Sequence, residues 1–200
     1  MADKKLSRKF YLVDGITLAK KLLGKYIVRK FNSRKLIGKI VETEAYMGPE
    51  DKASHSYGGK ITQRNQAEYL EGGHIYIYLC YGMYWQLNIT ANKNGKPECV
   101  LIRAVEPINS NSKLKIKNVK LLRKLTSGPG KLCKWMKLNK SFNKEDLTKS
   151  KRIWIEDRGE KIKSSQIIRA KRIGIDYAGN FWKNKLWRFY IKNNPFVSKL

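Results

Sequence analysis

Acidic side chains are scarce in this sequence of 200 residues: 16 Asp and Glu stand against 43 Lys and Arg, a formal net charge of +27. A protein this basic attracts polyanions, so nucleic acid is the expected partner. An anionic membrane surface is the competing partner, but the sequence has no long apolar run and no cationic amphipathic anchor, so we expect no membrane contact. An AT-rich genome would also encode part of the lysine excess, and both causes remain open.

Cysteine and histidine are scarce too. Cys80, Cys99 and Cys133 are odd in number and far apart, which predicts free thiols in a reducing compartment and not a disulfide framework. His55 and His74 stand alone, without the spacing of a zinc site, so we expect neither a metal nor a cofactor. The N-terminus is charged and has no apolar signal core, which favours a soluble intracellular protein.

Hydrophobic residues make up 42% of the chain, enough to bury a substantial core, and no repeat or linker divides it. We therefore expect one domain over residues 1–200, with a basic lead-in at 1–12. Alternation and turn signals predict strands at 25–29, 36–46, 74–80, 84–90, 98–106, 153–156 and near 187–191. Caps and stop signals predict helices at 16–23 and 62–70, near 124 and after 130. The fold class that this order predicts is α+β: a curved, mainly antiparallel sheet with a protruding hairpin and peripheral helices.

The stretch 40–56, IVETEAYMGPEDKASHS, is the most unusual part of the sequence. Its alternation places Glu42, Glu44 and Tyr46 on one face of a strand, before a Gly-Pro turn and one of the two histidines. Four of the 16 acidic residues lie between Glu42 and Asp51. One interpretation is an edge strand with solvated glutamates, which is common. The other is a pair of carboxylates with a chemical function.

A second unusual stretch is the hairpin 74–90, HIYIYLCYGMYWQLNIT. Tyrosines in such a hairpin most often pack in a core. Tyr81 is different, because beside Gly82 at the expected tip a large ring has little core to join. On a basic protein, an exposed ring at a loop tip is a candidate wedge between base pairs. Tyr46 and Tyr78, on neighbouring strands, could stack on a base.

Arg103 and the loop 127–131, SGPGK, are further candidates. Arg103 alternates with the apolar residues of a central strand, so it either pairs with Glu44 or Glu42 on the adjoining strand or faces outward. The SGPGK loop lacks Walker spacing. It is either a phosphate-holding helix start or only a Gly-Pro helix start.

Several long segments follow one another in a distinctive order: VETEAYMGPEDKASHSYGGKITQRN, IYIYLCYGMYWQLNI and VLIRAVEP, then LTSGPGKLC, NKSF, RIGIDYAG and RFYIKNNPFVS. Together they closely resemble the alkyladenine (3-methyladenine) DNA glycosylases of the non-helix-hairpin-helix type, over residues 18–198. Gln63 stands where the family pattern has proline, and Trp85 and Gln86 vary beside the hairpin. These departures bear on substrate preference and not on the reaction.

The resemblance implies roles for individual side chains. Glu44 matches the general base, and Arg103 matches the arginine that helps hold the attacking water. Tyr81 matches the tyrosine inserted into the minor groove. In the base pocket, Tyr46, His55 and Tyr78 match the aromatics that sandwich the flipped base. Asn88 matches the residue that crowds the amino group of normal guanine, and Ile173 matches a residue of the pocket wall.

The function that the resemblance implies is a monofunctional DNA glycosylase of base excision repair. It would hydrolyse the N-glycosidic bond of alkylated or deaminated purines in duplex DNA, as a monomer without a metal or cofactor. The basic stretches 113–144 and 161–192 would hold phosphates. Two alternatives stay open: a bifunctional glycosylase/lyase that uses a lysine amine, and a catalytically silent nucleic-acid-binding protein. The preferred lesion among 3-methyladenine, 7-methylguanine, hypoxanthine and ethenoadenine is also open.

Overall fold

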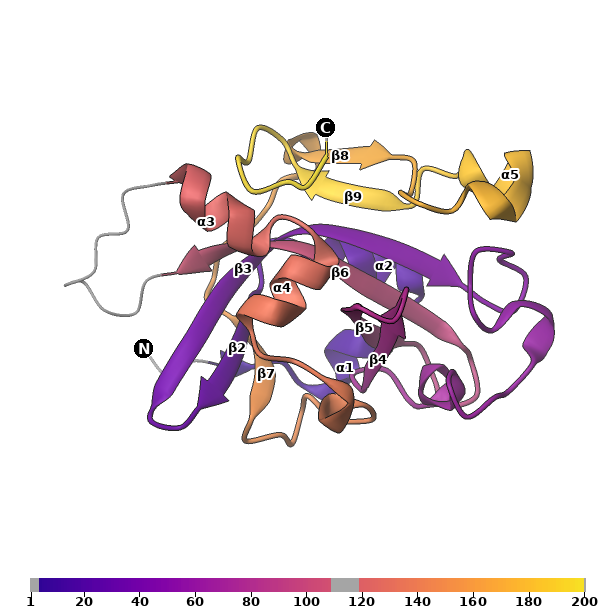
Figure 1. The fold of residues 1–200 in the computed structure, drawn as a ribbon, viewed down its shortest axis with the longest axis horizontal. Helices are drawn as coiled ribbons and strands as arrows, with labels where there is room; N and C mark the ends of the chain where they lie inside the picture. The colour runs from indigo at the N-terminus through magenta and orange to yellow at the C-terminus, as the bar shows by residue number, and fades with distance from the viewer. Residues whose placement is uncertain (1–3, 109–118, 200) are drawn as a thin grey trace.

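The computed structural model describes residues 4–108 and 119–199 (Figure 1). The described strands form one sheet in the order β1-β7-β2-β3-β6-β5-β4, with β9 on β3 and β8 on β9, and every pair is antiparallel. The strands are β1 (Lys4–Lys5), β2 (Tyr26–Phe31), β3 (Arg34–Met47), β4 (Ile75–Cys80), β5 (Tyr84–Ala91), β6 (Glu98–Ile108), β7 (Ile153–Asp157), β8 (Ile167–Ala170) and β9 (Arg188–Ile191). The helices are α1 (Arg8–Tyr11), α2 (Gly15–Leu22), α3 (Val119–Thr126), α4 (Pro129–Trp135) and α5 (Gly179–Lys183). The predicted α+β class is confirmed.

Strand β3 is the central strand of the sheet. One of its edges pairs with β6, and the other pairs first with β2 and then, at Glu42–Glu44, with β9. The β3–β6 register shifts on both sides of Glu42, which marks a bulge, and a bulge bends and twists a strand. Because strands flank this segment on both edges, Glu42 and Glu44 are both fully buried. The interpretation of a solvated edge strand is therefore wrong.

Helix α2 begins where the sequence predicts. The side chain of Asp14 accepts a hydrogen bond from the backbone N–H of Thr17 (2.9 Å) and caps the helix. Leu18 and Ala19 are fully buried in the main core. The hydroxyl of Thr43 donates to the carbonyl of Ala19 (2.9 Å), which ties the helix to β3. Helix α2 thus closes one side of the strand that carries the two buried glutamates.

The helix predicted at 62–70 is wrong, because the chain makes only a short 3₁₀ turn at Gln66–Tyr69. The cause is Asn65, which is 1% exposed. Its side-chain oxygen accepts from the backbone N–H and the hydroxyl of Thr62, and its amide donates to the carbonyl of His55 (2.9 Å). Such side-chain bonds to nearby backbone compete with helix formation. They hold this loop against the sheet, where its side chains reach a cavity.

The strand predicted to end at Pro107 continues through it, since β6 extends to Ile108. The other neighbour of β6, β5, pairs only with residues Glu98–Leu101. Among the residues with described positions, no strand flanks that edge of β6 at Pro107. Proline is tolerated at such an open edge, where its missing N–H breaks no ladder bond.

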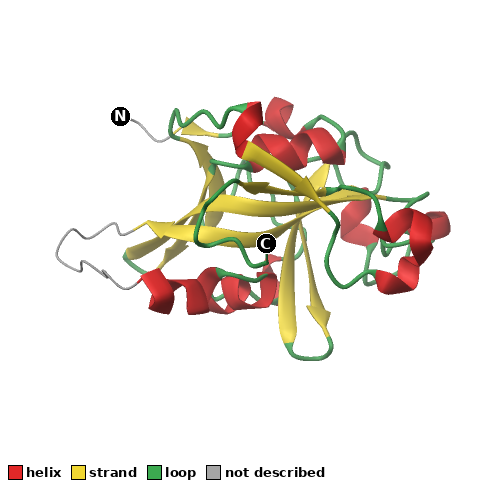
Figure 2. Ribbon diagram, turned by 90° about the horizontal axis from the view of Figure 1, so that it is seen from above, coloured by secondary structure: helices red, strands yellow, loops and turns green. Residues whose placement is uncertain are grey.

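Strands β4 and β5 form the protruding hairpin, which Figure 2 shows extending away from the rest of the sheet. At its tip Tyr81 and Gly82 both have positive φ angles (50° and 67°), and the N–H of Met83 donates to the carbonyl of Cys80 (3.1 Å). These are the features of a type I′ hairpin turn. Tyr81 is 85% exposed, so its ring belongs to no core.

The SGPGK loop starts α4 and serves packing. The hydroxyl of Ser127 donates to the carbonyl of Phe196 (2.7 Å). Gly130 lies against Tyr84, where a Cβ would come within 2.9 Å of the Tyr84 Cβ, so only glycine allows this close approach of α4 to β5. The interpretation as a Gly-Pro helix start fits these contacts. Residues 113–118 of the basic stretch 113–144 lie outside the described residues.

Candidate active site

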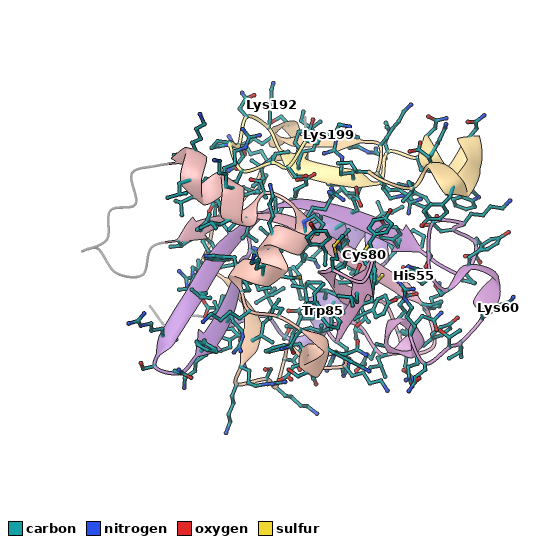
Figure 3. The ribbon with its side chains drawn as sticks, in the orientation of Figure 1. His55, Lys60, Cys80, Trp85, Lys192 and Lys199 are labelled. Carbon is teal, nitrogen blue, oxygen red and sulfur yellow. The ribbon has the colours of Figure 1, made fainter. Side chains whose placement is uncertain are left out.

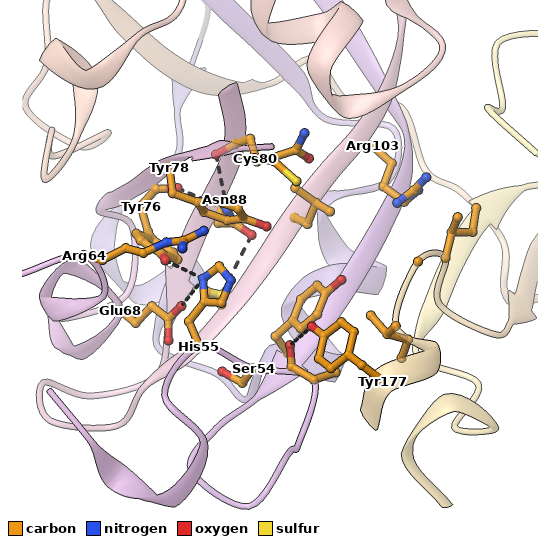
Figure 4. Close-up of a pocket in the computed structure, with 18 of the residues that line it drawn as sticks. Ser54, His55, Arg64, Glu68, Tyr76, Tyr78, Cys80, Asn88, Arg103 and Tyr177 are labelled. Atoms are coloured by element: carbon orange, nitrogen blue, oxygen red, sulfur yellow. Dashed lines mark hydrogen bonds and ion pairs between the residues drawn. The ribbon is translucent and has the colours of Figure 1, made fainter. Parts of the chain in front are cut away.

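A cavity of about 590 Å³ opens where the loop after β3, the 3₁₀ turn at 66–69, the β4–β5 hairpin and the loop 173–177 meet (Figure 4). Its walls contain all but one of the side chains to which the family resemblance gives a role: Tyr46, His55, Tyr78, Tyr81, Asn88, Arg103 and Ile173. The remaining one, Glu44, lies directly behind this wall. Residues 129 positions apart in the chain thus meet at one place, because the backbone N–H of Ile173 donates to Glu44 Oε1 (2.8 Å).

Aromatic rings dominate one side of the cavity. The ring centroids of His55 and Tyr78 are 4.5 Å apart at an angle of 76°, and those of Tyr76 and Tyr78 are 5.3 Å apart at 32°. Tyr46 adds its ring from β3, with the guanidinium of Arg172 4.8 Å from its centroid. Rings around a cavity offer faces on which a flat group can stack, and they attract a cationic group more strongly than a neutral one.

His55 is uncharged near neutral pH. Burial, and to a lesser degree the neighbouring Arg64, lower the pKa of His55 from 6.5 to about 4. Its Nδ1 lies 2.7 Å from the hydroxyl of Tyr76, which fixes the orientation of the ring. A neutral, oriented imidazole can stack on a cation without repelling it.

Glu44 has three partners and no exposed surface. Its Oε2 accepts from the hydroxyl of Tyr46 (3.0 Å) and from the Nη1 of Arg103 (3.2 Å), while Oε1 accepts from the N–H of Ile173. The predicted pairing of Arg103 with a glutamate of the adjoining strand is present, and Arg103 also reaches Glu42 through Nε (3.2 Å). Burial alone would lower the pKa of Arg103, but Glu44 and Glu42 raise it above its ordinary value. Arg103 is therefore a permanent cation between two carboxylates.

The carboxylate of Glu42 accepts hydrogen bonds from three residues. Besides Arg103, its carboxylate accepts from the Nη1 of Arg188 (2.9 Å) and from both the N–H (2.7 Å) and the hydroxyl (3.0 Å) of Ser198. It is absent from the lining of the cavity. This environment fits a structural carboxylate at the junction of β3, β6 and β9.

Asp51 and Arg172 form a second buried ion pair beside the cavity. The Nη2 of Arg172 donates to Asp51 Oδ1 (2.9 Å), and Asp51 also accepts the N–H groups of Met47 (3.1 Å) and Ala53 (3.0 Å). Both side chains of the pair are fully buried. Arg172 lies in the basic stretch 161–192 that was expected to hold phosphates, but its guanidinium fastens the loop after β3 and is buried.

Glu68 is one of the residues of this site that the sequence did not reveal. It is 1% exposed, lines the cavity, and holds its Oε1 4.0 Å from the Nδ1 of His55. Burial raises the pKa of Glu68 from 4.5 to about 7. No local pattern marks it, because the segment 62–70 resembles an ordinary capped helix. Only the fold of the loop around Asn65 brings Glu68 to the cavity.

Asn88 and Tyr177 complete the polar lining. Asn88 is 2% exposed, and its amide donates to the carbonyls of Tyr76 (3.2 Å) and Gln86 (3.3 Å), so its position on β5 is fixed. The hydroxyl of Tyr177 donates to the carbonyl of Ala53 (3.1 Å), although its ring is 70% exposed. Tyr177 was missed in the sequence, and its signal was the RIGIDYAG segment that also contains Ile173.

Exposed basic side chains lie on several elements of the described chain. Helix α4, which packs on β5, carries Lys131 and Lys134. Figure 3 shows Lys60 at the outer edge of the loop after β3, and Lys192 and Lys199 near the C-terminal strands. Across residues 4–108 and 119–199, no group of three or more His, Cys, Asp or Glu side chains is placed to hold a metal, and no helix has the length and apolar character to cross a bilayer.

Comparisons with known proteins show which proteins this chain is similar to. Residues 9–195 match the family model described as "Methylpurine-DNA glycosylase (MPG)". Curated proteins from Natranaerobius thermophilus, Clostridium novyi and Borreliella burgdorferi are 46%, 48% and 47% identical to the chain. The alignments cover 97%, 98% and 97% of this chain and 98%, 99% and 100% of the relatives. Each relative bears the name "Putative 3-methyladenine DNA glycosylase".

Proposed function

The chain belongs to the methylpurine-DNA glycosylase family, and from this premise we propose that it is a monofunctional DNA glycosylase of base excision repair. It hydrolyses the N-glycosidic bond of alkylated or deaminated purines that have been flipped out of duplex DNA. The observation that carries this proposal is the Glu44–Arg103 pair, which lies directly behind the wall of a cavity lined with aromatic rings. A protein that only bound nucleic acid would need no buried carboxylate at that place.

The cavity is the site of the flipped base. An enzyme that acts on the bond between base and sugar has to take the nucleotide out of the stack, which costs a few kcal/mol and less for damaged bases. Tyr46, His55 and Tyr78 supply the faces on which the purine stacks. Asn88, held by two backbone carbonyls, restricts the space for the exocyclic amino group of normal guanine.

Glu44 activates the water that attacks the sugar. Departure of the base leaves an oxocarbenium-like sugar, which a nearby carboxylate stabilises while it also accepts a proton from water. Glu44 Oε1 accepts a single N–H, so one of its lone pairs remains for a water. The Glu44 carboxylate is fully buried, and DNA binding opens a position for water between it and the cavity. Arg103 holds that water from the other side.

Tyr81 and the basic surface hold the duplex. Tyr81 is 85% exposed at the end of a protruding hairpin, so it can enter the space that the flipped nucleotide leaves. The lysines of α4 lie beside this hairpin and contact phosphates, which gives affinity without sequence preference. Double-stranded DNA is therefore the partner, and we expect the chain to act as a monomer.

Incubation with duplexes that carry 3-methyladenine, 7-methylguanine, hypoxanthine or ethenoadenine tests the proposal. We expect release of the free base and an abasic strand from at least one of them, unchanged by a chelator because no metal takes part. Borohydride should trap no covalent adduct, because water and not a lysine amine attacks the sugar. A trapped adduct would favour the glycosylase/lyase alternative. Tight binding without base release from any lesion would favour the catalytically silent alternative.

A further inference from the structure

Glu68 differs from the other buried acidic side chains in the part of the chain that the structure describes. Glu42, Glu44, Asp51 and Glu156 each pair with an arginine. Glu98, the last of them, has Lys96 at 4.0 Å and accepts the N–H of Gly15. The nearest potential cation to Glu68 is the ring of His55, which is neutral near neutral pH. Glu68 is thus a buried acid without a counterion.

The unpaired acid faces the base cavity. Glu68 Oε2 has no hydrogen-bond partner among the described residues, although it is fully screened from solvent. Figure 4 shows its carboxylate directed toward the ring of His55, the ring on which the base would stack. A buried charge with a vacant acceptor is costly, and the cost is removed when a cation or a donor enters the adjoining space.

Burial keeps the pKa of Glu68 raised and outweighs the hydroxyls of Ser54, Ser56 and Tyr76 and the charge of Arg64, which favour its ionised form. Arg64, on the preceding loop, is exposed and lies over the ring of Tyr78 (5.2 Å). Tyr76 on β4 and Cys99 on β6 have pKa values raised mainly by burial, so both are neutral. Tyr69, on the same turn as Glu68, also has a raised pKa. The remaining acids near the cavity, Glu44 and Asp51, are already neutralised by Arg103 and Arg172.

We propose that Glu68 selects bases by charge: its carboxylate is the counterion for a purine made cationic by ring alkylation, and it gives no such advantage to a neutral purine lesion. This inference rests on the proposed function and narrows its substrate class to cationic alkylpurines, with hypoxanthine and ethenoadenine as poor substrates. The protein as a whole carries a net charge of +27, which opposes a cationic base, so a local negative charge is needed at the pocket. The aromatic rings favour the same cations.

The pKa of Glu68, raised to about 7, supports this role. A carboxyl that is partly protonated in the empty pocket ionises when a cation binds beside it, because an opposite charge favours the charged form. At about pH 6 the empty carboxyl is mostly neutral and the selection weakens, while at about pH 8 it is fully ionised. His55 stays neutral over this range, since its pKa is about 4.

The test compares single-turnover excision of 3-methyladenine and hypoxanthine by wild type, Glu68→Gln and Glu50→Gln. Glu50→Gln removes an exposed negative charge on the loop after β3 and serves as the matched control. At about pH 8 we expect Glu68→Gln to lower the rate ratio of 3-methyladenine to hypoxanthine about tenfold, through slower excision of the cation, with Glu50→Gln equal to wild type. Lowering the pH to about 6 should reduce the ratio for wild type and leave that of Glu68→Gln unchanged.

Three outcomes overturn the inference. Equal loss on both lesions means that Glu68 is only structural, and thermal melts of the variant identify that case. A selective loss on hypoxanthine means that the protonated carboxyl donates a proton to neutral leaving groups. An unchanged ratio means that the charge of Glu68 does not reach the base. If wild type excises neither lesion nor the other two, the proposed function itself fails, which is a separate result.

Discussion

Two buried acids near the site, Glu42 and Glu68, show that the same chemical group can serve different purposes in one protein. Glu42 accepts four hydrogen bonds, one from Arg103, one from Arg188 and two from Ser198. Glu68 has an unpaired oxygen and no arginine or lysine within ion-pair distance in the described chain. A carboxylate surrounded by donors holds the scaffold together. One left without a counterion at a cavity is available for a ligand.

Glu44 lies between these two extremes. It shares Arg103 with Glu42, but it also borders the cavity through Tyr46 and Ile173. Its backbone is fixed by pairing with Leu101 on β6 and Arg188 on β9. The scaffold around Glu42 thus positions the neighbouring carboxylate on the same strand, two residues along.

Glu42→Gln should disrupt the buried ion-pair network and cause the largest loss of stability. Removing this charge leaves Arg188 buried without its carboxylate, and breaking a buried ion pair costs about 3–5 kcal/mol. Urea unfolding should show this loss, while the exposed Glu50→Gln should stay within about 0.5 kcal/mol of wild type. An unchanged stability of Glu42→Gln would mean that the network is not structural.

Glu68→Gln should have the opposite effect and raise the free energy of unfolding. The pKa of Glu68 is raised from 4.5 to about 7, so its favourable contribution is present below about pH 4.5 and is lost as the pH rises through 7. A shift of this size corresponds to about 3 kcal/mol. The variant should therefore gain stability over wild type at about pH 8 and gain almost nothing at about pH 4. A variant less stable than wild type at the higher pH would contradict the unpaired state of the acid.

Tyr81→Ala should affect excision without affecting stability, unlike the substitutions of Glu42 and Glu68. The ring is 85% exposed, so unfolding free energy should change by less than about 0.5 kcal/mol. A wedge contributes only after the nucleotide has flipped, so single-turnover excision from duplex DNA should fall by about tenfold, while binding to undamaged DNA stays the same. A large drop in melting temperature would end the wedge interpretation, because it would identify Tyr81 as a packed residue.

The smallest effect is expected from Lys131→Gln with Lys134→Gln on α4. Each phosphate contact that is lost should reduce the slope of log affinity against log salt by about 0.9. Binding to damaged and undamaged duplex should weaken equally, and the excision rate at saturating enzyme should not change. A loss confined to damaged DNA would place these lysines at the flipped nucleotide and not on the phosphate backbone.

Local patterns in the sequence predicted much of the scaffold. The alternation of apolar and polar residues predicted β3 and the hairpin, and Asp14 marked the start of α2. These signals depend only on residues a few positions away. The helix at 62–70 failed since the side chain of Asn65 bonds to the backbone ten residues earlier, at His55. Propensity does not register such a competing bond.

The pairing of buried charges could not be predicted. Arg172 and Asp51 are 121 residues apart, and Glu42 meets Arg188 and Ser198 over 146 and 156 residues. Arg172 therefore looked like one member of a basic run. The candidates Glu44, Tyr46 and His55 came from the resemblance to a known family, and the fold brings them together. No sequence pattern marked Glu68, because what distinguishes it is the absence of an arginine or lysine beside it in the described fold.

The most direct test of the whole account is single-turnover excision of 3-methyladenine from a duplex by wild type and Glu44→Gln. Glutamine keeps the size and hydrogen bonding of the side chain but cannot accept the proton from water. We predict release of free base by wild type and a rate lower by a factor on the order of 100 or more for the variant, with affinity for the lesion duplex retained. Excision by Glu44→Gln at nearly the wild-type rate would contradict the role of Glu44 and the mechanism built on it.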